Sequence, residues 1–141
     1  MARTVGELMT RDPVMRQPNA SVKDAARVMR DRDIGDVLVA DDGGRLVGMV
    51  TGRDIFVRGI ADRGDPSSTR LMDIVSKDLE TVTEKDPVEK AIEKMRSKAI
   101  RRIPVVDVSG KPVGMLTIGD LAVDLDSRSA LADISAADPS R

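Results

Sequence analysis

Two segments of this sequence carry the same short pattern of residues that can bind a small polar ligand. The pattern is Gly-Met-[Val/Leu]-Thr-x-x-Asp, and it occupies residues 48–54 and again residues 114–120. A Thr and an Asp at this spacing form a capping box, in which each side chain satisfies a backbone N–H at the start of a helix. The same helix start offers N–H groups and a positive dipole end to a phosphate, while the Asp can accept hydrogen bonds from a vicinal diol. The spacing therefore permits either a structural cap or a nucleotide site.

The residues that the sequence lacks restrict its catalytic chemistry. There is no His and no Cys, so a His general base, a Ser-His or Cys-His nucleophile and a His/Cys zinc site are all excluded. The remaining Asp, Glu, Lys, Ser and Thr residues show no catalytic arrangement, and Asp41 and Asp42, which precede two glycines, are typical of a turn. We therefore expect a protein that is not an enzyme, with no metal site and no obligatory cofactor.

Composition narrows the class of partner. The 141 residues are 40% hydrophobic and 33% charged, which is ordinary for a soluble globular protein. A net charge of −1 and the absence of Trp and Tyr argue against nucleic acid as a partner. No apolar run approaches the roughly 18 residues of a membrane span, and the first residues lack the apolar core of a signal peptide. With no Cys as well, we expect a cytoplasmic protein with no membrane partner.

An internal duplication organises the chain. A shift of 66 positions superposes 14 identical residues over positions 22–57 without a gap, where chance would give roughly two. Each copy has only about 50 to 60 residues, too few for a good core of its own. We therefore expect the copies to pack into one domain about a pseudo-twofold axis. The expected boundaries are 4–61 for the first motif, 62–68 for a linker, 69–125 for the second motif and 126–141 for a C-terminal tail.

Each copy has the same predicted order of elements: a short helix, a short extended piece, an amphipathic helix, two hairpin strands and a last helix. The fold class is α/β (α+β by some schemes), with a small mixed β-sheet flanked by helices in each motif. Capping residues predict where the helices start. The predicted starts are Thr4, Ser21 and Thr51 in the first copy; in the second they are Thr69, Asp86 (with Pro87 in the first helical position and Glu89 closing the capping box) and Thr117.

This duplicated order resembles a pair of cystathionine-β-synthase (CBS) domains. The resemblance rests on residues 103–107 (Ile-Pro-Val-Val-Asp), residues 114–120 and residues 47–55, and it covers about residues 4–125. It implies a stand-alone CBS pair, or Bateman module, that senses an adenosine-containing ligand such as AMP, ADP or ATP and does no catalysis. The family also includes pairs with no known ligand. A ligand-free module for protein–protein interaction is therefore the alternative.

The resemblance further implies two composite ligand clefts between the motifs, named here cleft A and cleft B. Cleft A is expected to bind more strongly, and cleft B weakly or not at all. The residues expected in cleft A are Thr51, Arg53, Asp54, Val75, Ser76, Ile100, Arg101 and Arg102. The residues expected in cleft B are Thr117, Asp120, Met9, Thr10, Val14, Ile34, Gly35 and Asp36.

The expected asymmetry between the clefts comes from charge. Arg101 and Arg102 stand where the first copy has Gly35 and Asp36, and arginine donors match phosphate oxygens well. The alternative is that the two arginines form a solvated end of the preceding helix. The family's proline is present at position 104, but position 38 holds a leucine, which alters one wall of cleft B.

The resemblance also implies partners. CBS pairs commonly form homodimers through exposed helical faces. Because no catalytic or nucleic-acid-binding domain is visible in this sequence, the regulated activity is expected to belong to another protein chain.

Overall fold

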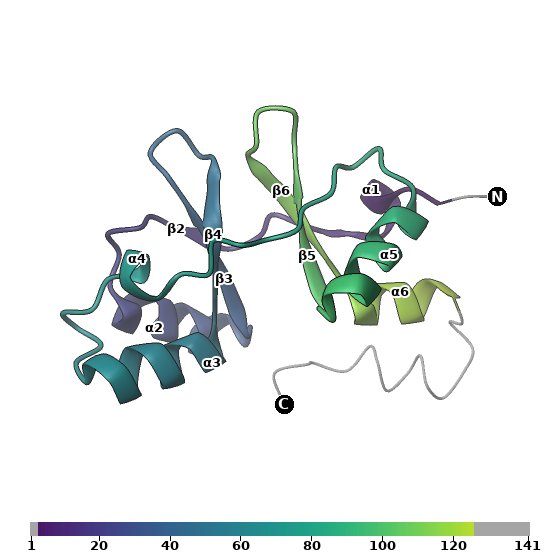
Figure 1. The fold of residues 1–141 in the computed structure, drawn as a ribbon. Helices are drawn as coiled ribbons and strands as arrows, with labels where there is room; N and C mark the ends of the chain where they lie inside the picture. The colour runs from purple at the N-terminus through teal and green to yellow at the C-terminus, as the bar shows by residue number, and fades with distance from the viewer. Residues whose placement is uncertain (1–2, 126–141) are drawn as a thin grey trace. The chain divides into compact units, whose positions relative to one another are not determined.

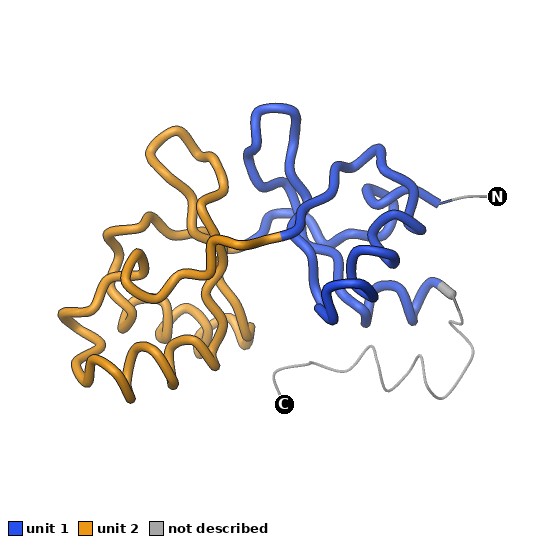
Figure 2. The backbone as a smooth tube through the Cα atoms, viewed as in Figure 1, with its two compact units in different colours: residues 1–13, 80–138 blue, residues 14–79, 139–141 orange. Residues whose placement is uncertain are grey.

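The computed structural model describes residues 3–125, and the expected C-terminal tail from residue 126 lies outside the described residues. The described chain forms two compact units, coloured separately in Figure 2. Unit 1 consists of residues 3–13 and 80–125, and unit 2 consists of residues 14–79. Over residues 3–125, no helix combines the length and apolar character needed to cross a membrane.

Unit 2 is built on a small mixed sheet with the strand order β2-β3-β4 (Figure 1). Strand β2 runs parallel to β3, and β3 pairs antiparallel with β4, so that Asp36 lies opposite Thr51. On the other edge of β4, Ser76 makes an antiparallel bridge with Met49. The elements of unit 2 are β2 (Met15–Arg16), α2 (Val22–Arg32), β3 (Asp36–Ala40), β4 (Leu46–Thr51), α3 (Gly52–Asp54), the π-helix η1 (Ile55–Ala61) and α4 (Leu71–Ile74).

Unit 1 repeats this plan with the strand order β1-β6-β5. Strand β1 pairs antiparallel with β6, which places Thr10 opposite Met115, and Val82 bridges Val105 in parallel on the outer edge of β5. The elements of unit 1 are α1 (Val5–Leu8), β1 (Thr10–Arg11), α5 (Val88–Lys98), β5 (Arg102–Val106), β6 (Pro112–Thr117) and α6 (Ile118–Leu125). Both units therefore contain the predicted hairpin and amphipathic helix, and the predicted mixed α and β architecture is confirmed.

Each unit has its own apolar core, and the cores show which segments belong together. Val5 and Met9, from the start of the chain, are buried with the strands of the second sequence copy. Leu71 and Ile74, which begin the second copy, are buried with the strands of the first. The first helix of each sequence repeat thus packs in the unit formed mainly by the other repeat. The expected pseudo-twofold relation between the copies stays a prediction.

Most predicted helix starts are confirmed, and two are wrong. Thr4, Ser21 and Thr51 are the N-caps of α1, α2 and α3. Helix α4 instead starts after Arg70, because the buried Thr69 turns its hydroxyl back to donate to the carbonyl of Asp65 at 2.8 Å.

Helix α5 starts after Pro87, one residue later than predicted. The carboxylate of Asp86 caps no backbone N–H of α5 and instead accepts a hydrogen bond from the backbone N–H of Thr83 at 2.8 Å. That contact makes Asp86 part of the preceding turn rather than the cap of α5.

Candidate functional site

The two Thr-x-x-Asp segments have the same geometry in the structure. The N–H of Thr51 donates to Oδ2 of Asp54 at 2.9 Å, and the N–H of Asp54 donates to Oγ1 of Thr51 at 3.1 Å. Thr117 and Asp120 make the same two bonds at 2.9 and 3.1 Å. Each segment is therefore a true capping box that fixes a helix start at the end of a strand. All four side chains are half-buried rather than enclosed.

The capping role does not use up the polar atoms of these residues. The bond from the Thr N–H takes one carboxylate oxygen of each Asp, and a carboxylate has a second oxygen with its own lone pairs. The Thr hydroxyl accepts from the helix and still carries a proton to donate. Each box is thus a rigid structural element that can also present an acceptor and a donor to a ligand.

The strand beside each capping box brings a second charged residue to it. In unit 2, Asp36 lies directly opposite Thr51 in the β3–β4 ladder. In unit 1, Arg102 lies directly opposite Thr117 in the β5–β6 ladder. Opposed residues of an antiparallel pair have their side chains on the same face of the sheet, about 5 Å apart at Cβ. The two boxes therefore have neighbours of opposite charge.

The backbone fixes this arrangement in the same way in both units. The N–H of Gly52 donates to the carbonyl of Gly35 at 3.0 Å, and the N–H of Ile118 donates to the carbonyl of Arg101 at 2.9 Å. These bonds attach the first residue of each helix to the segment that enters the hairpin. The position of each capping box relative to its neighbouring strand is thus set by the backbone.

A hydroxyl residue lies on the other side of each box. Ser76 exchanges two backbone hydrogen bonds with Met49, at 3.0 and 3.1 Å, and Thr10 lies opposite Met115 in the β1–β6 ladder. Met49 precedes Thr51 by two residues, which places both side chains on one face of β4. Ser76 lies in the same unit as Thr51, and Thr10 in the same unit as Thr117. Their expected common role in a ligand cleft stays a prediction.

Two glycines allow the segments of Ser76 and Thr10 to lie close against β4 and β6. This role was not predicted from the sequence. A Cβ on Gly48 would overlap the carbonyl oxygen of Ser76 and lie 2.6 Å from Cγ2 of Val75. A Cβ on Gly114 would lie 2.6 Å from Sδ of Met9 and 2.8 Å from the carbonyl oxygen of Thr10. Both glycines stand in the duplicated pattern, and that repetition was the available signal.

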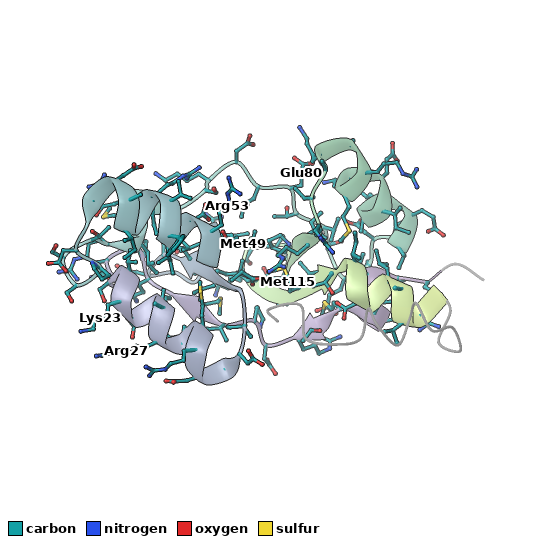
Figure 3. The ribbon with its side chains drawn as sticks, turned by 90° about the horizontal axis from the view of Figure 1, so that it is seen from below. Lys23, Arg27, Met49, Arg53, Glu80 and Met115 are labelled. Carbon is teal, nitrogen blue, oxygen red and sulfur yellow. The ribbon has the colours of Figure 1, made fainter. Side chains whose placement is uncertain are left out.

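The structure divides the residues predicted for cleft A between the units. Thr51, Arg53 and Asp54 share unit 2 with Val75 and Ser76, and Arg53 projects from the first turn of the helix in Figure 3. The other three members lie in unit 1, beside Thr117. They are Ile100, Arg101 and Arg102.

The residues predicted for cleft B are divided in the same manner. Thr117 and Asp120 share unit 1 with Met9 and Thr10. The others lie in unit 2: Val14, Ile34, Gly35 and Asp36. The pairing of residues across the two units stays a prediction, whereas the pairings of Asp36 with Thr51 and of Arg102 with Thr117 are properties of single units.

The alternative of Arg102 as a solvated helix end is wrong, because α5 ends at Lys98 and Arg102 is a half-buried strand residue.

The duplicated fold and the two capping boxes agree with the comparison to known families. A family model of the CBS domain matches residues 5–59 and again residues 71–126. This chain belongs to the CBS domain family. The CBS pair is 37% identical to the uncharacterized protein YlbB of Bacillus subtilis over 139 residues, which covers 95% of this chain and 93% of that protein.

Solved structures of CBS pairs are similar to it along most of the chain. The CBS domain pair of protein MJ0100, solved in complex with 5′-methylthioadenosine and S-adenosyl-L-methionine, has a TM-score of 0.80 at 25% identity, covering 92% of this chain and 100% of that one. The cytosolic domain of the Mg²⁺ channel MgtE in complex with ATP has a TM-score of 0.75 at 28% identity, covering 87% of this chain and 48% of that one. CBS pairs of similar structure thus bind adenosine-containing ligands.

This chain matches only a part of several longer relatives. The CBS pair spans 60% of the length of the uncharacterized protein MK0525 of Methanopyrus kandleri, to which it is 32% identical. Relatives named as homoserine O-acetyltransferases and inosine-5′-monophosphate dehydrogenases are matched over only 22–25% of their length. The similarity to enzymes is therefore a similarity to a part of each.

Proposed function

We propose that this CBS pair is a regulatory module that binds an adenosine-containing ligand of the AMP, ADP or ATP type. The observation that carries the proposal is the duplicated capping box, which presents a Thr hydroxyl and an Asp carboxylate at a helix start, next to a chain segment that carries a Ser or a Thr. The adenosine ligands of similar CBS pairs support it. The module has no catalytic role and needs no cofactor besides this regulatory ligand.

The chemistry of the capping box fits the sugar of such a ligand. The second carboxylate oxygen of Asp54 or Asp120 can accept hydrogen bonds from the ribose hydroxyls, and the Thr hydroxyl can donate to a sugar or phosphate oxygen. The binding changes the activity of a second protein only if the ligand has different affinities for two conformations of the module. That second protein carries the regulated activity, and we place the module with it in the cytoplasm.

Charge indicates which box takes the phosphate. Arg102 is the cross-strand neighbour of Thr117, so unit 1 combines the box with a guanidinium that can bind phosphate oxygens. Unit 2 combines the box with Asp36, although Arg53 adds a cation on the helix itself. We therefore propose that the unit 1 box binds the phosphorylated ligand. The competing hypothesis is cleft A, in which Arg101 and Arg102 serve the box of Thr51 and Asp54.

Titration of the protein with ATP and with S-adenosylmethionine tests the proposal. A ligand at 100 times its dissociation constant should raise the free energy of unfolding by about 2.7 kcal/mol. Asp120→Ala should lower ATP affinity at least about tenfold, since it removes charge-assisted hydrogen bonds. Circular dichroism of Asp120→Ala checks that the fold survives the loss of this capping residue. If neither compound binds the unaltered protein, the ligand-free interaction module is the better account.

A simple spectrum adds an independent test. The protein has no Trp and no Tyr, so a desalted sample should absorb very little near 260 nm. An absorption band there that disappears after denaturation and filtration would identify a nucleotide that purified with the protein.

We also propose that the CBS pair forms a homodimer through the outer face of η1. Phe56, the only aromatic residue, is 74% exposed, and Val57 and Ile60 are 46% and 40% exposed on the same helix. Arg53 precedes this apolar face and Asp62 follows it. A second copy lying antiparallel would therefore match each Arg53 with an Asp62, as a twofold interface requires.

Sedimentation of two variants tests the homodimer. Phe56→Asp should convert a dimer into a monomer, because it places a charge in the centre of the apolar face. Val108→Asp is the matched control, since Val108 is also an exposed apolar residue but lies at the tip of the β5–β6 hairpin. A monomer in the unaltered protein, or a dimer that survives Phe56→Asp, would overturn this proposal.

A further inference from the structure

Arg58 connects the helix of the unit 2 capping box to the segment that carries Ser76. It lies one turn beyond Asp54, in η1, and its Nη1 donates to the carbonyl oxygen of Ile74 at 3.3 Å. Ile74 is the last residue of the one-turn helix α4, whose final carbonyls have no partner inside the helix. Arg58 thus supplies a hydrogen bond that the short helix cannot supply for itself.

The packing around this bond brings the two segments together. Gly59, next to Arg58, is buried, and a Cβ there would lie 3.4 Å from Cγ1 of Val22 and 4.0 Å from Cδ1 of Ile74. The absence of a side chain at Gly59 lets η1 approach α2 and α4 closely. The side chain of Ile74 is almost fully buried at 1% exposure, so the carbonyl that Arg58 binds belongs to a fixed part of the core.

The residues that follow Ile74 lead to the candidate site and then out of the unit. Ser76 is bonded to Met49 of β4 through both of its backbone groups. The chain leaves unit 2 after Leu79. The stretch from Ile74 to Leu79 therefore starts at the Arg58 contact, passes the edge of β4 beside the capping box, and continues into unit 1.

The second sequence copy has no equivalent of this contact. Position 124, which corresponds to Arg58, is an aspartate, and its carboxylate pairs with Arg3 at 3.2 Å. In unit 1 the end of the last helix is thus tied to Arg3, which precedes the N-cap of α1, and not to the C-terminal end of that short helix. The connection made by Arg58 is specific to unit 2.

We propose that Arg58 is a positioning residue that couples the Thr51–Asp54 capping box to the segment 74–79. Its guanidinium holds this segment against β4, so that a ligand bound at the box also stabilises the segment through which the chain leaves unit 2. This regulatory route rests on the proposed function, whereas the positioning of the segment by Arg58 does not.

Amide hydrogen exchange of the ligand-free protein tests the positioning role. Arg58→Ala should speed the exchange of the Val75 and Ser76 amides about fivefold, as expected for the loss of one hydrogen bond. Arg58→Lys, which keeps the charge with a shorter reach, should give an intermediate rate. Arg63→Ala is the matched control, since it removes an exposed arginine beyond the end of η1. Unchanged exchange at Ser76 in Arg58→Ala would overturn the proposal.

Exchange in the presence of saturating 5′-methylthioadenosine, an adenosine ligand without phosphate that the acidic neighbour of the unit 2 box does not repel, tests the coupling. In the unaltered protein, added protection should extend from residues 51–54 to residues 74–79. In Arg58→Ala, 5′-methylthioadenosine should still protect residues 51–54, but the protection of 74–79 should be lost. Equal protection of 74–79 in both proteins would overturn the coupling. Absence of 5′-methylthioadenosine binding to the unaltered protein would reject the coupling, and if ATP fails to bind as well, the proposed function is also rejected. In either case the ligand-free rates would still decide whether Arg58 positions the segment.

Discussion

Units 1 and 2 share a backbone plan and differ in the charges placed around it. Both have a capping box with the same two hydrogen bonds, the same bond from the helix start to the strand entry, and a glycine that admits a neighbouring chain segment. Several corresponding positions differ in charge, among them Asp36 and Arg102, Arg53 and Gly119, and Arg58 and Asp124.

The comparison separates what the fold needs from what a ligand would sense. The duplicated Gly, Thr and Asp residues form backbone contacts that any pair of this architecture requires, so their repetition alone has a structural reason. The charged residues that differ are not needed for those contacts. A difference in ligand binding between the two units must therefore come from the residues that the copies do not share.

The largest expected effect is on stability, and it tests whether the glycine contacts are equivalent. Gly48→Ala should lower the free energy of unfolding by about 3 kcal/mol, because the new Cβ meets the backbone carbonyl of Ser76. Gly114→Ala should cost less, about 2 kcal/mol, because its closest neighbour is the flexible end of Met9 and the backbone carbonyl of Thr10 is farther away, at 2.8 Å. Urea denaturation measures both. A larger loss for Gly114→Ala would mean that the two glycine contacts are ranked wrongly.

The next effect is on ligand binding, and it tests the charge difference between the boxes. Arg102→Ala should weaken ATP binding about tenfold, because it removes a charge-assisted contact to phosphate. Asp36→Ala should leave ATP affinity unchanged or raise it, since it removes a negative charge. Isothermal titration at constant salt is the measurement, with 5′-methylthioadenosine as the ligand that lacks phosphate. Greater weakening by Asp36→Ala than by Arg102→Ala would break the assignment.

A smaller effect is expected where the amphipathic helices end. Ala99 and Asp33 occupy corresponding positions after α5 and α2, and both have left-handed backbone, with φ of 54° and 55°. Because alanine is strained there and aspartate is more tolerant, Ala99→Gly should raise the free energy of unfolding by about 0.5 kcal/mol. Asp33→Gly should change it less. Thermal denaturation compares the two variants. A loss of stability in Ala99→Gly would contradict the inferred strain at Ala99.

The smallest expected effect is on the pH dependence of stability. It concerns Asp86 of unit 1, a carboxylate with no counterpart at the corresponding position of the first copy. The N–H of Thr83 holds the pKa of Asp86 below its usual range, and Lys90 lowers it further; the corresponding residue of the first copy is Ala20. A carboxyl whose pKa is lower in the folded state stabilises the protein above its unfolded pKa of about 4. This contribution is lost as the pH falls through the pKa of the folded state.

Asp86→Asn tests this contribution. The variant should lose less stability than the unaltered protein between pH 5 and pH 3, as measured by urea denaturation at each pH. Equal losses would show that Asp86 does not contribute to the acid sensitivity of unit 1.

Much of the local structure could be predicted because it depends on neighbouring residues. The capping boxes at Thr51 and Thr117, the cap at Ser21 and both hairpins follow from patterns within about ten residues, and each is confirmed. The starts at Thr69 and Asp86 were wrong because each of these side chains bonds to the preceding turn instead.

The arrangement of segments could not be predicted from local patterns. The duplication shows that two equivalent halves exist, but nothing in a local pattern shows that α1 and α4 each pack with the other copy's strands. The neighbours of the boxes depend on strand register, which sets Asp36 opposite Thr51 and Arg102 opposite Thr117. The sequence analysis assigned Arg102 by family resemblance to the box of the other copy, and that assignment stays a prediction.

A double-mutant cycle on ATP affinity measures whether each capping box acts with the charge on its own neighbouring strand. The cycle combines Arg102→Ala with Asp120→Asn, and a second cycle combines Arg102→Ala with Asp54→Asn. We expect a coupling of at least about 0.5 kcal/mol between Arg102 and Asp120 and additive effects for Arg102 and Asp54. Coupling of Arg102 to Asp54 with additivity toward Asp120 would contradict this expectation and favour cleft A.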